Sequence, residues 1–151
     1  FDKTLTFETI HWIKETSGLP VLVKGILRPD DAAKCLEQKA DGIIISNHGG
    51  RQLDTAVPTL KQVEPIRKEI GTDAILIVDG GIRRGTDILK SLALGANAIQ
   101  IGRPILWGLN YDGQKGVELV LKLLLDEFLE SMILSGSRNI KEITRDLVQE
   151  I

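Results

Sequence analysis

Four short apolar runs, separated by segments of helical length, constrain the fold of this chain more than any other feature. The runs cover residues 21–23, 42–45, 74–78 and 98–101. Short runs rich in β-branched residues are typical of strands that are buried on both faces of a parallel sheet. Because amphipathic segments alternate with them, the order is βαβα, and we predict an α/β fold with a parallel sheet.

Helix-capping residues mark the segments between the runs. We expect helices over residues 7–16, from Pro29 with Asp30 and Asp31, over residues 60–70 closed by Gly71, over residues 87–94 capped by Thr86 and closed by Gly95, and over residues 117–134. No linker or change of composition divides residues 1–151, so we predict a single unit.

Each apolar run ends in polar residues or glycine. The endings are Lys24 with Gly25, Ser46 to Arg51, Asp79 to Arg84, and Gly102 with Arg103. In a parallel sheet these ends lie at one edge, where α/β folds bind their ligands. The glycine and arginine motifs follow the third and fourth runs, and (β/α)8 barrels commonly form a phosphate site after strands seven and eight. A complete barrel needs about 250 residues, so we predict the C-terminal half of a (β/α)8 TIM barrel, strands five to eight.

The string SNHGGRQLD follows the second run and places a histidine three residues before an arginine. Gly49 and Gly50 can adopt positive φ and let the backbone approach a flat ligand. His48 can remove a proton near neutral pH, and the guanidinium of Arg51 can hold a carboxylate with two hydrogen bonds. The structural alternative is a polar turn with a capping histidine.

Two further motifs, VDGGIRRGTD and IGRP, carry the features of an anion site. The backbone of Gly80 and Gly81 can present N–H groups, Arg83 can pair with a phosphate, and Gly102 with Arg103 offers a second set of donors. The alternative is a tight turn with solvated arginines. Lys24 is predicted as a buried ammonium that needs an electron-rich partner, either a ligand or an ion pair with Asp79. Ser46 can contact a ligand or cap its own turn.

Several classes of function are disfavoured. The net charge is −2, and the basic residues are scattered, so nucleic acid is not an expected partner. The segment 117–134 is interrupted by charged residues and predicts an amphipathic helix, not a membrane span. The single cysteine, Cys35, is expected to pack in a helix, and no residue cluster has metal-ligand spacing. Trp107 is expected against the barrel bottom or a neighbouring subunit, with the rim of the site as the alternative.

Together, VLVKG, SNHGGRQLD, VDGGIRRGTD and IGRPILWG resemble the FMN-dependent α-hydroxy-acid oxidases and dehydrogenases. That family includes glycolate oxidase, lactate oxidase and the flavin domain of flavocytochrome b2, and only its C-terminal half is matched. The resemblance implies FMN-dependent oxidation of an L-2-hydroxy acid to a 2-oxo acid, with oxygen or another electron acceptor. It assigns His48 as the base and Arg51 to the substrate carboxylate. The implied FMN ligands are Lys24, Ser46, Asp79, Gly80, Gly81, Ile82, Arg83, Gly102 and Arg103.

In the family, further groups of the active site come from the N-terminal half: an aspartate behind the histidine, a second arginine, tyrosines at the substrate and residues under the flavin. We therefore expect the 151-residue chain alone to bind FMN weakly with little turnover, and the full-length enzyme to be a homo-oligomer. The alternative is a noncatalytic FMN- or phosphate-binding half barrel, or an interaction module. The chain ends without a Ser-Lys-Leu address, so cytoplasm is expected, or the peroxisome for a trimmed eukaryotic chain.

Overall fold

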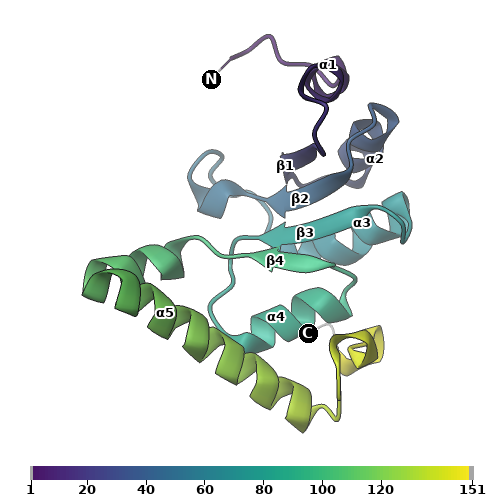
Figure 1. Ribbon diagram of the computed structural model, residues 1–151. Helices are drawn as coiled ribbons and strands as arrows, with labels where there is room; N and C mark the ends of the chain where they lie inside the picture. The colour runs from purple at the N-terminus through teal and green to yellow at the C-terminus, as the bar shows by residue number, and fades with distance from the viewer. Residues whose placement is uncertain (1, 150–151) are drawn as a thin grey trace.

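Four parallel strands lie side by side in the computed structural model, which describes residues 2–149 (Figure 1). They are β1 (Leu22–Ile26), β2 (Gly42–Ser46), β3 (Ile75–Asp79) and β4 (Ala98–Gln100), hydrogen-bonded in chain order. Successive βα units of a barrel give this order, whereas a doubly wound sheet reverses direction at a switch point. The predicted parallel α/β sheet is confirmed. Of the terminal tripeptide considered above, Glu150 and Ile151 lie outside the described residues.

Five helices accompany the strands in the described part of the chain. They are α1 (Glu8–Ser17), α2 (Pro29–Glu37), α3 (Val63–Ile70), α4 (Gly85–Ala93) and α5 (Arg103–Leu134), with 3-10 turns η1 (His48–Gly50), η2 (Thr59–Gln62), η3 (Ile140–Glu142) and η4 (Arg145–Leu147). The segment predicted as one helix over 60–70 is divided into η2 and α3. Pro65 lacks the N–H that would bond the carbonyl of Lys61, which accounts for the division.

Two other helix starts differ from the prediction. Thr86 is not the cap of α4, which begins one residue earlier, at Gly85. The carboxylate of Asp87 accepts the backbone N–H groups of Arg83 and Arg84, each at 2.9 Å, and so satisfies donors at this helix end. The last helix begins at Arg103, well before residue 117, and is kinked at 112–113. Arg103 is therefore in the first turn of a helix.

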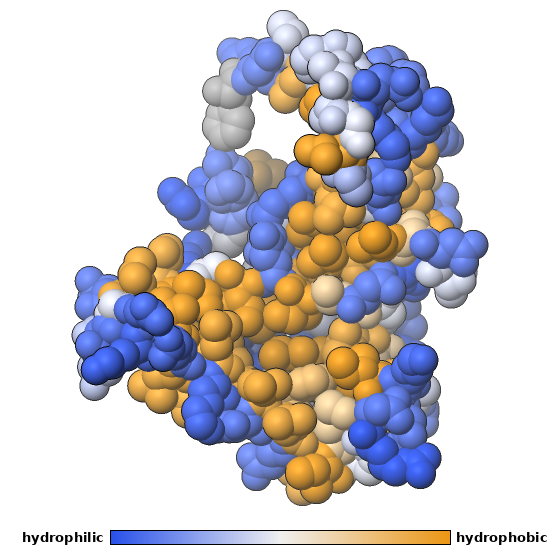
Figure 2. Space-filling view, in the orientation of Figure 1, coloured by the Kyte–Doolittle hydropathy of each residue, from blue (hydrophilic) through white to orange (hydrophobic). Residues whose placement is uncertain are grey.

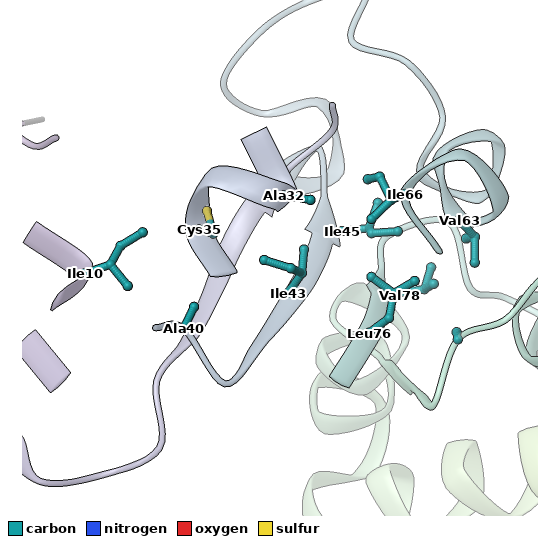
Figure 3. Close-up of a cluster of buried hydrophobic side chains, with 11 residues drawn as sticks. Ile10, Ala32, Cys35, Ala40, Ile43, Ile45, Val63, Ile66, Leu76 and Val78 are labelled. Atoms are coloured by element: carbon teal, nitrogen blue, oxygen red, sulfur yellow. The ribbon is translucent and has the colours of Figure 1, made fainter. Parts of the chain in front are cut away.

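The main core lies between the sheet and helices α2 and α3 (Figure 3). Side chains alternate along a strand, so Ile43, Ile45, Leu76 and Val78 point to these helices and are fully buried. Each carries a large apolar side chain whose burial stabilises the sheet by roughly 1.5–3 kcal/mol. This face holds the strand ends in fixed positions.

The other face of the sheet carries the site. Strand register aligns Ser46, Asp79 and Gln100 in one row at the carboxyl ends of β2, β3 and β4. At the opposite end of this face Leu22 is 38% and Ile75 is 44% exposed. Figure 2, in the orientation of Figure 1, shows apolar side chains gathered over the strands and along α5. The inner face therefore combines an open apolar part with a polar row at the strand ends.

Candidate functional site

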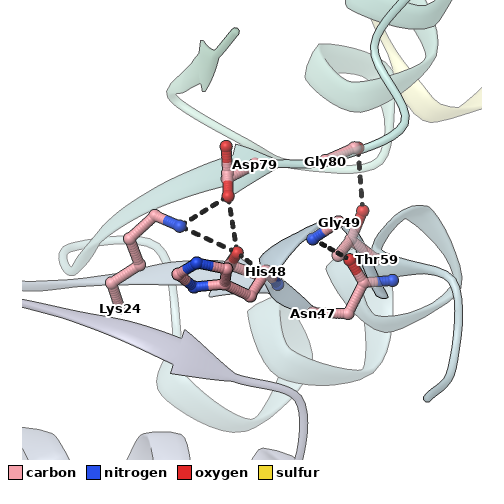
Figure 4. Close-up of polar contacts among 8 residues, drawn as sticks. Lys24, Asn47, His48, Gly49, Thr59, Asp79 and Gly80 are labelled. Atoms are coloured by element: carbon pink, nitrogen blue, oxygen red, sulfur yellow. Dashed lines mark hydrogen bonds and ion pairs between the residues drawn. The ribbon is translucent and has the colours of Figure 1, made fainter. Parts of the chain in front are cut away.

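An ion pair links β1 to the end of β3. Lys24 Nζ lies 2.6 Å from Asp79 Oδ2 and donates to Ser46 Oγ at 3.0 Å. Ser46 Oγ in turn donates to the same Asp79 oxygen at 2.5 Å. Figure 4 shows Lys24 reaching from β1 toward Asp79 on β3. The prediction of a buried ammonium at the end of a strand is wrong, because β1 continues through a bulge to Ile26 and the Lys24 side chain is 38% exposed.

Ser46 holds the histidine loop, residues 47–51 after β2, through a hydrogen bond to its backbone. It is 2% exposed, and its hydroxyl accepts the backbone N–H of His48 at 3.0 Å. His48, Gly49 and Gly50 all have positive φ, at 55°, 67° and 73°. Residues other than glycine rarely adopt this conformation, and it often occurs at functional sites. The loop therefore holds His48 in a costly backbone conformation that the Ser46 hydroxyl helps to maintain.

The side chains of Asn47 and Arg103 also hold the histidine loop. Asn47 Oδ1 accepts the N–H of Gly49 at 3.0 Å, and Asn47 Nδ2 donates to the Val57 carbonyl at 3.3 Å. The guanidinium of Arg103 donates to the Gly49 carbonyl. A Cβ on Gly49 would lie 2.8 Å from that guanidinium, so glycine permits the contact. Arg103 thus connects the start of α5 to the loop that carries His48.

The loop after β3 leaves backbone donors available. Gly80 and Gly81 have φ of 94° and 81°, and the Gly80 carbonyl accepts from Thr59 Oγ1 at 3.1 Å. Within residues 2–149, the N–H groups of Gly81 and Ile82 donate to no other group. Space is open where a Cβ would stand on Gly81. Unpaired backbone donors beside open space are typical of an anion-binding concavity.

The two consecutive arginines of this loop point to different partners. Arg83 lies over the ring of Trp107, 5.0 Å from its centroid, and donates to the Ile82 carbonyl at 2.7 Å. Arg84 instead pairs with Glu127 on α5 at 3.0 Å. The contact with Arg83 places Trp107 at the rim of the site, and not at the barrel bottom.

A cavity of about 460 Å³ unites these loops, within the range of roughly 300–1,000 Å³ that small-molecule sites occupy. It is lined by Lys24, His48, Gly49, Arg51, Asp79, Gly80, Gly81, Ile82, Arg83, Gln100, Ile101, Gly102, Arg103, Ile105 and Leu106. Of the predicted site residues, Ser46 alone does not line it, and acts through its hydrogen bonds. Gln100 was not among the predicted site residues, although a polar residue at the end of an apolar run is a usable signal. Ile105 and Leu106 were not predicted either, because their helix was expected to begin only at residue 117.

The charges of the cavity favour an anionic ligand. Arg51, Arg83 and Arg103 line it together with Lys24, and the Asp79 carboxylate offsets one of these four cations. Within the described chain, no cluster of His, Cys, Asp or Glu could hold a metal ion. Cavities of this charge at the carboxyl ends of parallel strands, beside glycine turns, are where barrels of βα units commonly bind phosphate groups.

Comparison with known proteins identifies the class further. The family model described as FMN-dependent dehydrogenase matches residues 1–150. The chain belongs to this family.

The chain is also similar to proteins described as 2-hydroxyacid oxidases and as a lactate oxidase. The chain is 51% identical over 147 residues to a 2-hydroxyacid oxidase of Dictyostelium discoideum, covering 97% of this chain and 38% of that protein. It is 48% identical over 139 residues to an L-lactate oxidase of Nostoc sp., covering 92% and 38%. A peroxisomal (S)-2-hydroxyacid oxidase of Arabidopsis thaliana is 46% identical over 149 residues, covering 99% and 41%. The chain thus spans about 40% of the length of these relatives.

Solved structures agree on the fold. A protein described as a lactate oxidase of Pediococcus acidilactici superposes with a TM-score of 0.93 at 35% identity, covering 99% of this chain and 42% of that one. A mandelate oxidase with benzoyl-formic acid gives 0.89 at 42% identity, covering 93% and 42%. The sheet is therefore part of a TIM barrel, which confirms the predicted partial barrel. Among residues 2–149, no helix is both long and apolar enough to span a bilayer.

Proposed function

We propose that this chain forms the FMN- and substrate-binding part of an FMN-dependent (S)-2-hydroxy-acid oxidase or dehydrogenase, which converts an L-2-hydroxy acid to a 2-oxo acid. One observation carries the proposal: a single cavity contains His48 and Arg51 together with the loops around Arg83 and Arg103. The relatives named as 2-hydroxyacid and lactate oxidases support the reaction class.

The residues present fit FMN. The unpaired N–H groups of Gly81 and Ile82, with the guanidinium groups of Arg83 and Arg103, suit a phosphate that carries roughly −1.5 to −2 charges. Lys24 suits the electron-rich edge of the flavin ring, and bound FMN would supply the acceptor for the substrate's electrons. Further ligands are proposed at Asp79, Gly80 and Gly102, whereas Ser46, which does not line the cavity, is proposed to hold Lys24 and the backbone of His48 in place.

Substrate chemistry is assigned to the second loop. Arg51 lines the cavity, and its planar guanidinium can hold a carboxylate with two parallel hydrogen bonds. His48 lies beside it and accepts the proton that the substrate loses on oxidation. Ser46 keeps the His48 backbone in place through the hydrogen bond described above.

The complete protein would supply what this chain lacks. We propose that the remaining part of the barrel closes over the inner face, that oxygen or another acceptor reoxidises the flavin, and that the complete enzyme is a homo-oligomer, which sedimentation velocity can test. Its proposed compartment is the cytoplasm, or the peroxisome in a eukaryotic source. Microscopy of the tagged complete protein tests that assignment.

Anaerobic reduction of bound FMN by glycolate or L-lactate in the complete protein tests the function. We expect His48→Gln to slow reduction by about 10²- to 10⁴-fold while FMN stays bound. Arg51→Lys should mainly raise KM, because the bidentate contact is lost. Arg28→Lys is the control, since Arg28 pairs with Asp30 outside the cavity. Reduction at an unchanged rate in His48→Gln would refute the role of the histidine. A wild-type protein that binds FMN but is reduced by neither acid would favour the noncatalytic alternative.

A further inference from the structure

A contact between α5 and the start of α4 lies next to the loop after β3, residues 80–84, which is called the phosphate loop below because it would hold the phosphate of FMN. Glu127 Oε2 accepts the backbone N–H of Gly85 at 2.9 Å, and Glu127 Oε1 accepts from Arg84 Nη1 at 3.0 Å. Both partners directly follow Arg83, which lines the cavity. The pKa of Glu127 is lowered, first by the Gly85 hydrogen bond and then by the guanidinium of Arg84. Glu127 is therefore held as a carboxylate against the loop, although it does not line the cavity.

The contact is too close for any residue but glycine at position 85. A Cβ on Gly85 would lie 2.1 Å from the Phe128 nitrogen and 2.2 Å from the Glu127 carbonyl carbon. Both are backbone atoms, so side-chain movement cannot relieve the overlap. Phe128 is buried with Leu89 in the cluster between α4 and α5, which fixes the tail helix relative to the loop.

We propose that Glu127 is a positioning residue that sets the geometry of the phosphate loop without touching the ligand. The proposal rests on the proposed FMN function. Asp87 occupies the N–H groups of Arg83 and Arg84, and Glu127 occupies that of Gly85.

These two carboxylates determine which donors remain. With the N–H groups of residues 83–85 bound, the backbone donors that this loop leaves to the cavity in the described chain are those of Gly80, Gly81 and Ile82, and the backbone of Arg83 is held in place. Without the Glu127 carboxylate, Gly85 and Arg84 lose their partner and the loop can adopt other conformations. A phosphate would then meet donors that are no longer preorganised.

Flavin titration of the apoprotein of the complete enzyme tests the proposal, with riboflavin as the probe that lacks the phosphate. We expect Glu127→Gln to weaken FMN binding by about tenfold, the equivalent of one hydrogen bond to a charged group. Riboflavin binding should change little. Asp126→Asn is the matched control, because this neighbouring carboxylate on α5 pairs only with Lys122 in the described chain.

Whether Glu127→Gln weakens or strengthens FMN binding distinguishes a positioning role from a purely electrostatic effect. Glu127→Gln removes a negative charge near the phosphate, so a purely electrostatic effect would strengthen FMN binding. Positioning predicts weaker binding, and Arg84→Gln should weaken it too, with the double variant showing less than the sum of both effects.

Three results would overturn the proposal: stronger FMN binding in Glu127→Gln, an equal loss for riboflavin, or an effect no larger than that of Asp126→Asn. Failure of the proposed function would be visible separately. In that case the wild-type protein itself would not prefer FMN to riboflavin.

Discussion

Replacing Ser46 with alanine removes a hydroxyl that is hydrogen-bonded to Lys24, His48 and Asp79. It accepts from Lys24 Nζ and from the His48 N–H, each at 3.0 Å, and donates to Asp79 at 2.5 Å. Hydrogen bonds to charged groups contribute about 1.5–3 kcal/mol and neutral ones about 0.5–1.5 kcal/mol. Lys24 is partly exposed and keeps its ion pair with Asp79, so its share is small. We therefore expect Ser46→Ala to lower the free energy of unfolding by about 2–3 kcal/mol.

Urea unfolding of the apoprotein, followed by circular dichroism, measures this loss. The midpoint should fall by roughly 1–2 M for an ordinary dependence on denaturant. Ser91→Ala is the matched control, because Ser91 is equally buried but its hydroxyl only donates to the Asp87 carbonyl one turn earlier. Alanine favours the helix, so this change should cost less than about 1 kcal/mol. Equal losses for the two serines would refute the role given to Ser46.

Three further predictions concern the scaffold. Gly85→Ala should cost at least about 3 kcal/mol of unfolding free energy, because its Cβ would overlap the α5 backbone. Gly102→Ala should cost far less, since Gly102 has open space around it and a negative φ. Chemical denaturation of the two variants compares these losses. The folded-state pKa of Glu127 lies below its ordinary value of 4.5. The ionised carboxylate therefore contributes to the free energy of unfolding above pH 4.5, and this contribution is lost as the pH falls through the folded-state pKa. Glu127→Gln should therefore lose less unfolding free energy between neutral and acid pH than the wild-type protein, as measured by unfolding at several pH values. Burial raises the pKa of Cys35 to about 11, so a thiol reagent at pH 8 should label it only after unfolding; rapid labelling of the folded protein would contradict its burial.

Local patterns were sufficient to predict the parallel sheet and the residues that follow its strands. The β-branched runs at 42–45 and 74–78 form β2 and β3, whose outward side chains are buried against helices α2 and α3. Gly49 and Gly50 do adopt the positive φ expected of them, and Gly80 and Gly81, for which no φ was predicted, adopt it too. The roles of the individual site residues in binding and catalysis remain predictions.

The errors arose where tertiary contacts decide. Lys24 looks buried because apolar residues precede it, but the inner face on which it lies is open, and a bulge extends its strand. The start of α4 depends on Asp87 and on Glu127, and Glu127 lies more than forty residues away, so the Thr86 cap was a reasonable local prediction. Trp107 could not be placed before α5 was known to begin at the edge of the cavity.

The central claim is that FMN binds at the carboxyl ends of the strands, between the loop after β3 and the start of α5. Backbone amide spectra of the ¹⁵N-labelled 151-residue chain, recorded during FMN titration, test this residue by residue and tolerate weak binding. We predict the largest chemical shift changes at Gly81, Ile82, Gly102 and Arg103, with riboflavin causing smaller changes there. Changes concentrated instead around Lys14 and Asp41 at the opposite end of the sheet, or no change at any flavin concentration, would contradict the account.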